Sequence, residues 1–357
     1  MKLLLTGYIG HKNFGDDLLL YIAYEQMLKL DGVDLHVIST SSSGDAYLDI
    51  FLPAATIHRY SGNIPLFFYK QFDKVFFIGG GIFFDYREEI SLKVYLKNKL
   101  SNKLRFNFAR MSGTRFAGLG IGVGPYHSHR AKKIHGDILD NFDILGVRDR
   151  TSVKLVREIA AVDPLLTNDL SLLLEQHASL DSKNQMDKKS FIFCPRSYKH
   201  EEKYEKHLVN LRELSQRLNG DGHEVKWLFL QEEKADIYGF VPESDKLIVW
   251  DPESMGINDF IGFFEQSHAV ISSRMHSIYV AGIVGAPFIA INVHQKLTFA
   301  SQLFYKKPLI IEPEASVEDY YACISRLQEL EKTESDIKLE RTVLKDAYEK
   351  VYDWVFR

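Results

Sequence analysis

The feature that most restricts the fold of this sequence is the alternation of short apolar runs with amphipathic segments. Residues 2–6 form a short apolar run, residues 17–30 have the spacing of a helix, and residues 34–40 are apolar again. The run at 74–78 ends at three glycines, as a strand that turns sharply would. This alternation predicts a parallel β-sheet with helices on both faces, because parallel strands need a crossover between them.

The alternation occurs twice, on either side of a polar segment. Residues 178–189 are rich in Ser, Asp, Asn and Lys and have the composition of a linker. With 357 residues, the chain is about twice the usual length of one domain. We therefore expect an N-terminal α/β domain over residues 1–180, a C-terminal α/β domain over 190–315, and a charged helical tail over 316–357. Two such domains predict an α/β architecture like that of the B-type glycosyltransferases, with two Rossmann-like domains facing a cleft.

Composition argues against several classes of protein. The formal net charge of −4 disfavours a nucleic-acid partner, which usually needs a basic face. No apolar stretch approaches the roughly 20 residues of a membrane-spanning helix, and the apolar run at the N-terminus is too short for a signal peptide. Cys194 and Cys323 form neither a disulfide framework nor a metal cluster, which favours a reducing cytoplasm and two small core side chains.

Two glycine-rich segments in the first half follow apolar runs and are candidates for ligand contact. The segment 7–17 opens a helix, and its Asn13 and Asp16 have no evident core function, although Asp16 also suits the N-cap of that helix. The next glycine run, which contains Gly80 and Gly81, offers backbone amides that can form an anion-binding nest. We expect both segments to line a site.

Weaker signals lie at three later strand ends. Alternate glycines at 118–124 indicate close packing or the approach of a ligand. For Arg148 and Asp149 a structural salt bridge is the simpler interpretation. Asp169 either points into the cleft or caps the chain that follows it.

In the second half, two strand ends carry arginines. Arg196 ends the apolar run 190–195, and its planar fork suits a carboxylate or a phosphate, with a surface salt bridge as the alternative. Arg274 and His276 follow the run 269–272 in a serine-rich turn that opens a helix. The positive end of the helix dipole and Arg274 both favour a bound anion. The dipole also disfavours a protonated His276, so we expect His276 to be a neutral hydrogen-bond donor or a base more readily than a cation.

Six motifs in the same order resemble those of the polysaccharide pyruvyl transferase family, over roughly residues 1–300. They lie at residues 7–17, 79–85, 120–125, 148–152, 169–174 and 272–291. The sequence departs from the commoner family pattern at Leu119, at Met275 and at the leucine after Asp169. None of these departures removes a charged group, so they bear on the choice of acceptor more than on the reaction.

The resemblance implies phosphoenolpyruvate as the donor and a pyruvyl ketal across two hydroxyls of a sugar as the product. The acceptor would be a precursor of a cell-surface polysaccharide, such as an exopolysaccharide or a capsule, and is often a lipid-linked oligosaccharide. By this resemblance the C-terminal domain is the donor side and the N-terminal domain is the acceptor side. Arg196, Arg274 and His276 match the positions that hold phosphoenolpyruvate.

The residues that we expect around the substrates come from both halves. The candidates for general acid or base are His276, Asp16 and Asp85, because ketal formation needs a proton at the vinyl carbon and a base near the hydroxyls. We expect no cofactor and no metal, since two arginines and a helix N-terminus suffice to hold the donor. The expected substrate contacts are Arg196, Arg274, Met275, His276, Ser273, Asn13, Gly80, Gly81 and Asp169.

Two other functions compete with this one. A nucleotide-sugar glycosyltransferase of the same fold usually needs an acidic residue for the ribose, and the segment 286–292 offers none. A glycan-binding module without catalysis is disfavoured by the gathering of Arg, His and Asp at strand ends. A lipid-linked acceptor would also allow peripheral membrane contact through the basic helix at 87–110, for which the alternative is a solvated face. The cations of that helix are Lys93, Lys97, Lys99, Lys103 and Arg105.

Overall fold

The computed structural model describes residues 1–41, 44–61, 64–85, 89–174, 190–196 and 201–357. The chain forms two compact domains. Domain 1 comprises Met1–His11, Asp16–Leu173 and Glu340–Arg357, and domain 2 comprises Lys12–Gly15 and Leu174–Leu339. The expected tail 316–357 is thus divided between the two domains, and the expected linker 178–189 lies outside the described residues.

Domain 1 is built on a parallel sheet. Within the described residues it has eight strands in the order β3-β2-β1-β4-β6-β7-β8, with β5 paired to β6. The strands are β1 (Lys2–Thr6), β2 (Asp34–Ser39), β3 (Thr56–Arg59), β4 (Lys74–Phe77), β5 (Gly80–Asp85), β6 (Arg115–Tyr126), β7 (Ile144–Val147) and β8 (Leu165–Leu166). The central strands β1 and β4 are mostly apolar and almost entirely buried, because helices cover both faces of the sheet.

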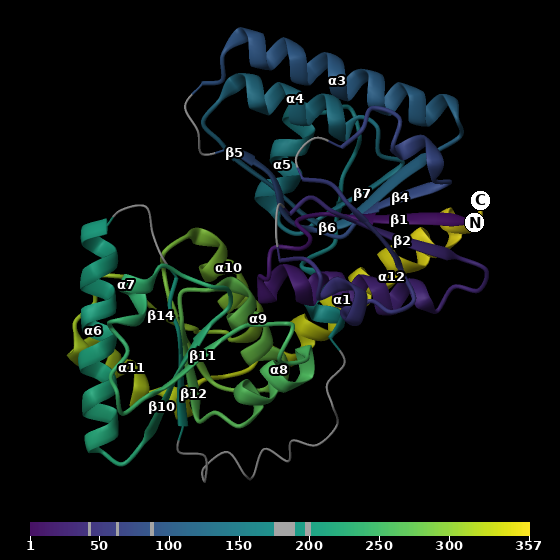
Figure 1. Cartoon of the computed structure of the whole chain (residues 1–357). Coiled ribbons are helices and arrows are strands. Elements are labelled where there is room, and N and C mark those ends of the chain that lie inside the picture. Colours follow the sequence, from purple (N-terminus) through teal and green to yellow (C-terminus); the bar gives the residue numbers. More distant parts are fainter. Residues whose placement is uncertain (42–43, 62–63, 86–88, 175–189, 197–200) are drawn as a thin grey trace. The chain divides into compact units, whose positions relative to one another are not determined.

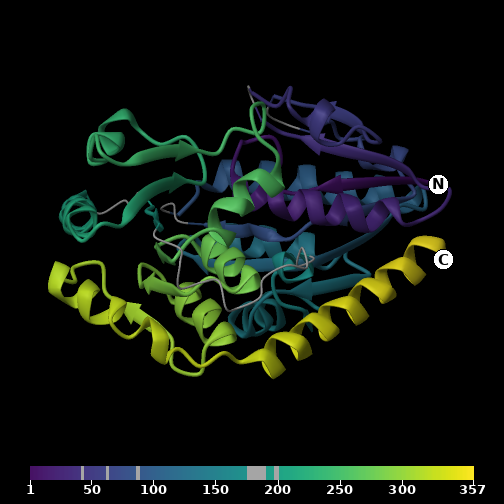
Figure 2. The same ribbon diagram turned by 90° about the horizontal axis from the view of Figure 1, so that it is seen from below.

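The helices of domain 1 form two layers (Figure 1). In this view α3 (Leu92–Met111), α4 (His129–Leu139) and α5 (Arg150–Ile159) lie on one side of the sheet, and α1 (Phe14–Leu28) and α12 (Glu334–Phe356) lie on the other. Shorter turns of helix are α2 (Leu48–Phe51), η1 (Tyr69–Gln71) and η2 (Leu170–Leu173). The last helix is tied to the sheet, because the buried Lys74 ammonium donates to the Trp354 carbonyl over 2.8 Å. The two ends of the chain therefore lie near each other in this domain (Figure 2).

Domain 2 repeats the pattern on a smaller scale. In the part of it that is described, a parallel sheet has the order β11-β10-β9-β12-β13-β14. The strands are β9 (Ser190–Cys194), β10 (Glu224–Phe229), β11 (Lys246–Val249), β12 (Ala269–Ser272), β13 (Phe288–Ile291) and β14 (Leu309–Ile311). The helices are α6 (Glu201–Gly220), α7 (Ala235–Tyr238), α8 (Ile257–Glu265), α9 (Met275–Val284), α10 (Gln295–Phe304), α11 (Val317–Ile324) and η4 (Leu327–Glu329). In Figure 1, α6, α7 and α11 cover one face and α8, α9 and α10 the other.

Each sheet has a point at which the strand order reverses direction. It lies between β1 and β4 in domain 1, and between β9 and β12 in domain 2. In open parallel sheets, ligands bind outside the carboxyl ends of the strands at such a point. The first glycine-rich loop follows β1, Gly79 follows β4, Arg196 follows β9, and Arg274 follows β12. The segments singled out in the sequence therefore follow the strands at the two switch points.

The glycine run after β4 differs from the expected anion-binding nest. Gly79 and Gly80 both have positive φ, and the chain then continues as β5, in which Gly80 pairs with Ile121 of β6. A Cβ atom on Gly79 would lie 2.7 Å from the Leu119 carbonyl oxygen. These glycines are needed because the backbone bends close to a neighbouring strand. Gly80 and Gly81 thus lie in a strand that pairs with β6, and not in a compact turn.

Candidate active site

The turn between β12 and α9 fixes the backbone of Arg274. The Arg274 N–H donates to the Ser272 hydroxyl over 2.9 Å, and the Ser277 hydroxyl donates to the Arg274 carbonyl over 2.7 Å. Arg274 is the N-cap residue of α9, so its side chain stands beside the partially positive end of that helix. The side chain is buried. This turn therefore presents a rigid, positively charged group at the switch point of domain 2.

A carboxylate of the protein itself already contacts this arginine. Nη2 of Arg274 and Oε1 of Glu233 form an ion pair, and both side chains are buried. Glu233 is held in turn by its backbone N–H, which donates to the Tyr238 hydroxyl over 2.8 Å. Gln231 Nε2 lies 3.4 Å from the same carboxylate oxygen. Sequence reasoning missed Glu233, because it lies in the loop after β10, far along the chain from Arg274.

Lys12–Gly15, which we call the N-terminal loop, belongs to domain 2 because its residues form hydrogen bonds, an ion pair and ring contacts there. The Phe14 N–H donates to the Leu230 carbonyl over 2.7 Å, and the Phe14 ring packs against Trp250. Lys12 pairs with Glu253 over 2.9 Å. The Asn13 amide donates to Gln231 Oε1 over 2.7 Å. Asn13, which we expected to bind a ligand, thus contacts Gln231. Gln231 in turn hydrogen-bonds to Glu233, the ion-pair partner of Arg274.

Gly15 allows the same loop to approach His276. A Cβ atom at position 15 would overlap the imidazole ring at Nδ1. The Gly15 N–H donates to the Asn13 side-chain oxygen over 3.0 Å, which fixes the loop in this close approach. The structure therefore brings the first motif of the sequence and the Arg274–His276 turn together within domain 2.

The remaining expected contacts of domain 2 surround this turn. Arg196 follows β9 and is half-buried, whereas Ser273 and Met275 are buried. The Ser273 N–H donates to the Cys194 carbonyl over 3.1 Å, which joins the turn to β9. Burial raises the pKa of the Cys194 thiol to about 12, so this cysteine has no thiolate at neutral pH and serves as a packed side chain.

In domain 1, the glycines of β5 and β6 make room for Arg148. A Cβ atom on Gly122 would lie 2.6 Å from Cζ of the Arg148 guanidinium, and one on Gly81 would lie 3.8 Å from its Nη2. Arg148 Nε lies 3.5 Å from Oδ2 of Asp149, so the expected salt bridge is present. The alternate glycines and the arginine after β7 were separate signals in the sequence, and the structure joins them.

Asp169 lies behind Arg148. Its side chain is completely buried, its Oδ2 is 4.0 Å from Nη1 of Arg148, and its Oδ1 accepts the Ser171 hydroxyl over 2.7 Å. Asp169, which we expected to contact the substrate, thus has a side chain with no exposed surface that lies next to Arg148. Its influence on a ligand would pass through Arg148.

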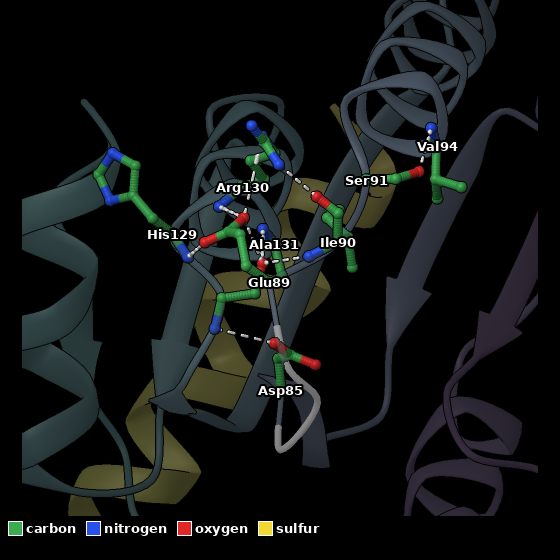
Figure 3. A network of polar contacts seen from close by, with 9 residues as sticks. Asp85, Glu89, Ile90, Ser91, Val94, His129, Arg130 and Ala131 are labelled. Atoms are coloured by element: carbon green, nitrogen blue, oxygen red, sulfur yellow. Dashed lines mark hydrogen bonds and ion pairs between the residues drawn. The ribbon is translucent and has the colours of Figure 1, made fainter.

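Asp16 and Asp85 occupy different surroundings in domain 1. Asp16 is partly exposed, and its Oδ1 would lie 3.3 Å from a Cβ atom on Gly80, so these two expected site residues are adjacent. Asp85 is buried at the end of β5 and accepts the Ser128 N–H over 3.1 Å, just before α4 (Figure 3). The described contact of Asp85 therefore holds the start of a helix.

The described ranges contain no group of three or more His, Cys, Asp or Glu side chains placed to hold a metal ion. Across the same ranges, no helix is long and apolar enough to cross a membrane.

The fold is similar to that of several solved enzymes. The UDP-GlcNAc 2-epimerase from Methanocaldococcus jannaschii gives a TM-score of 0.61 at 12% identity, over 99% of this chain and 100% of that chain. The UDP-GlcNAc 2-epimerase from Neisseria meningitidis, solved with UDP-GlcNAc bound, gives 0.60 at 10% identity over 100% of both chains. A glycosyltransferase from Rickettsia africae gives 0.57 at 12% identity, over 100% and 98%. Such low identity shows the fold alone, and it confirms the predicted B-type glycosyltransferase-like fold of two Rossmann-like domains.

The two sequence comparisons give different results. No curated protein sequence matches the chain significantly. The family model of the polysaccharide pyruvyl transferases matches residues 13–295, which begin at Asn13 and include Arg148, Arg196, Arg274 and His276. Because this match covers most of the chain, the protein belongs to the polysaccharide pyruvyl transferase family.

Proposed function

We propose that this protein transfers the pyruvyl group of phosphoenolpyruvate to two hydroxyls of a glycan and so forms a cyclic ketal. Family membership supports pyruvyl transfer to a polysaccharide precursor. The observation that carries the choice of donor is the buried Arg274, whose guanidinium pairs with a carboxylate at the switch point of domain 2. A residue that binds the Glu233 carboxylate has the chemistry to bind the carboxylate or phosphate of phosphoenolpyruvate.

The donor would lie against Arg274, Arg196 and the N-terminus of α9. A guanidinium has five N–H donors, so Arg274 can keep Glu233 at Nη2 while it binds a second anion. Arg196 follows the neighbouring strand and adds the second positive charge. Ser273, Met275 and Asn13 complete this donor site. These groups hold the donor without a metal or a cofactor.

The chemistry needs two proton transfers. A proton is added to C3 of phosphoenolpyruvate, which leaves a positive centre at C2, and the oxygen of one glycan hydroxyl bonds to C2 as it loses its proton. The C2–O bond to phosphate then breaks, and the second hydroxyl adds to C2. The products are the ketal, which carries a methyl group, and phosphate that has taken the second proton. A general acid near C3 and a base near the hydroxyls would accelerate these steps by about 10²–10⁴-fold each.

His276 is our first candidate for the acid or the base. Gly15 lets the N-terminal loop pack onto its imidazole, so the ring is held in one place beside Arg274. Asp16 is the candidate for the acid or base on the acceptor side. It is partly exposed and lies beside Gly80, at the start of β5, which also contains Gly81. Asp85 is less suited, because its buried carboxylate already accepts the Ser128 N–H.

Domain 1 would bind the acceptor, a precursor of an exopolysaccharide or capsule, on the cytoplasmic side of the membrane. Arg148 would contact it, with Asp169 as the residue that positions Arg148. The test is to incubate the purified protein with phosphoenolpyruvate and a set of hexosides, and to follow phosphate release and the mass of the ketal. We expect phosphate and ketal to form in equal amounts.

A nucleotide-sugar glycosyltransferase remains the alternative, because two of the similar structures are enzymes of UDP-GlcNAc. The same assay separates the two functions. Release of a nucleoside diphosphate from a sugar nucleotide, with no phosphate released from phosphoenolpyruvate by any hexoside, would overturn the proposal.

A further inference from the structure

The outer face of α3 carries a row of leucines that the domain does not bury. Leu92, Leu96, Leu100 and Leu104 recur at every fourth position, which places them along one side of the helix. Their exposed fractions are 56%, 55%, 59% and 36%. In Figure 1, α3 lies at the outer boundary of its layer in domain 1. A continuous apolar row on the surface of an ordered helix indicates a binding face.

The core of the domain does not need these leucines. The inner side of α3 is formed by Phe106 and Ala109, which are buried in the main cluster of domain 1. Phe106 packs on Phe116 of β6 with ring centroids 4.9 Å apart. The leucines can therefore be replaced without opening the core.

The start of α3 is firmly held (Figure 3). The Ser91 hydroxyl accepts the Val94 N–H and caps the helix. Just before it, Glu89 accepts the N–H groups of His129 and Arg130 in the first turn of α4, over 2.7 and 3.0 Å. The exposed row thus belongs to a helix with a fixed position on domain 1.

All charged side chains of α3 are basic. The helix contains six basic residues and no Asp or Glu. Lys99 and Arg105 turn toward the domain, where Lys99 pairs with Asp137 over 3.3 Å and Arg105 donates to the Ile64 carbonyl over 2.8 Å. These two residues therefore do not belong to the basic surface that the sequence predicted. Lys93, Lys97 and Lys103 are exposed on the outer side of the helix.

Aromatic residues extend the row near the end of the helix. Phe67 is exposed and packs on Phe108 of α3, with ring centroids 4.7 Å apart. Lys70 Nζ lies over the Phe67 ring, 5.0 Å from its centroid. The face therefore combines leucines, a phenylalanine and lysines, which is the composition of helices that lie in a membrane interface.

We propose that the outer face of α3 binds the surface of an anionic lipid bilayer, with the leucines among the acyl chains and the lysines at the headgroups. We call this face the α3 surface. Lysines beside an anionic leaflet gain electrostatic attraction, and leucines gain from leaving water. A second copy of the chain fits less well, since two such helices would oppose lysine to lysine. Nucleic acid would use the lysines and leave the leucines in water. Vesicle binding needs no substrate, so this inference does not rest on the proposed pyruvyl transfer.

The test is sedimentation of the full chain with vesicles of phosphatidylcholine containing about 30% phosphatidylglycerol, compared with phosphatidylcholine alone. We expect binding to the anionic vesicles, lost at high salt. The double variant Leu96→Asn with Leu100→Asn should bind ~10-fold more weakly or worse. Reversal of charge at Lys93, Lys97 and Lys103 to Glu should abolish binding. The matched control replaces two apolar residues of domain 2 with similar exposure, Val209→Asn and Phe299→Asn, and should bind like the parent.

A second measurement does not depend on loss of binding. Trp227, Trp250 and Trp354 are buried, so a new indole in Leu100→Trp reports on the α3 surface. Its emission should shift to the blue with anionic vesicles and be quenched by brominated lipid. Equal binding of the parent and the Leu96→Asn, Leu100→Asn variant would overturn the proposal. So would equal binding to neutral vesicles, or a dimer of the parent that the same two substitutions dissociate.

Discussion

Each domain holds, close behind a strand end, an arginine whose side chain has little exposed surface, and the two arginines are held in different ways. Arg274 in domain 2 is in close contact with the Glu233 carboxylate. In domain 1, Arg148 Nε lies 3.5 Å from Asp149 Oδ2 and Arg148 Nη1 lies 4.0 Å from Asp169 Oδ2. Its guanidinium occupies space that a Cβ atom on Gly122 would need. An ion pair with Glu233 holds Arg274, whereas Arg148 has its position because Gly122 has no side chain. The function of domain 2 should therefore be sensitive to changes of charge, and that of domain 1 to changes of size.

The largest effect is expected from Arg274→Ala. The substitution removes the buried positive charge at the proposed donor site and leaves Glu233 to repel an anion. Loss of a desolvated charge pair costs about 2–5 kcal/mol, so kcat/KM for phosphoenolpyruvate should fall by roughly 30- to 5,000-fold. Arg274→Lys should recover little, because an ammonium lacks the planar fork.

The control for this prediction is Arg326→Ala, an exposed arginine paired only with Glu329 among the described residues. Its steady-state kinetics should match those of the parent. An unchanged KM for phosphoenolpyruvate in Arg274→Ala would remove Arg274 from the donor site.

The next effect tests sensitivity to size in domain 1. In Gly122→Ala, the new methyl group would lie 2.6 Å from Arg148 Cζ, so the guanidinium must move. A displacement of about 1 Å at a substrate-positioning group can cost on the order of 100-fold in rate. We expect a rise in KM for the glycan acceptor and a fall in kcat, with KM for phosphoenolpyruvate preserved.

Gly262→Ala in α8 is the matched control, because no described heavy atom beyond its chain neighbours and the backbone of its own helix lies within 4 Å of the Cβ it would add. It should leave the kinetics unchanged and keep or raise stability. If Gly122→Ala lowers only the melting temperature, Arg148 has a structural role and the acceptor site lies elsewhere.

A smaller effect of opposite sign is expected from Glu233→Gln. The amide keeps a hydrogen-bond acceptor for Arg274 but removes the negative charge that competes with the donor. KM for phosphoenolpyruvate should fall by about 3- to 10-fold, which corresponds to roughly 1 kcal/mol. Glu233→Ala should instead raise KM, because nothing then holds the guanidinium in place. Equal kinetic effects of the two variants would show that the charge of Glu233 has no influence on the donor.

The sequence sufficed for the fold because its signals are local. Apolar runs ended by glycine or by a polar turn marked most strands, and Arg274 could be found because it lies between a strand and a helix. Glu233 could not be found, because its role depends on a contact with a residue on another strand end. The assignment of Lys12–Gly15 to domain 2 depends on where the Phe14 ring packs, which no pattern in the loop indicates.

The α3 helix shows a second limit of sequence patterns. A row of leucines at every fourth position normally predicts the buried face of a helix. Here Phe106 and Ala109 face the core, and Leu96 and Leu100 face outward. The sequence predicted a basic helix at 87–110, and the structure has α3 at Leu92–Met111, but the sequence did not indicate which of its two apolar sides the sheet covers.

The smallest expected effect concerns stability and not catalysis, and it lies in domain 1 beside Asp85. Burial lowers the pKa of His135 from its ordinary value of 6.5 to about 4, although the Asp85 charge acts in the opposite direction. Because the folded pKa is depressed, the unfolded chain takes up the proton first. The stability that His135 contributes is complete above about pH 6.5 and is lost as the pH falls toward about 4.

At pH of about 5 this loss should amount to about 1–2 kcal/mol. In His135→Gln the free energy of unfolding, measured by urea titration, should fall less between pH of about 7 and about 5 than in the parent. His129→Gln, which changes an exposed histidine on the same helix, should keep the parent's pH dependence. The same slope in the parent and His135→Gln would mean that His135 can be protonated in the folded domain. The environment of Asp85 would then be wetter than its burial and its contact with Ser128 indicate.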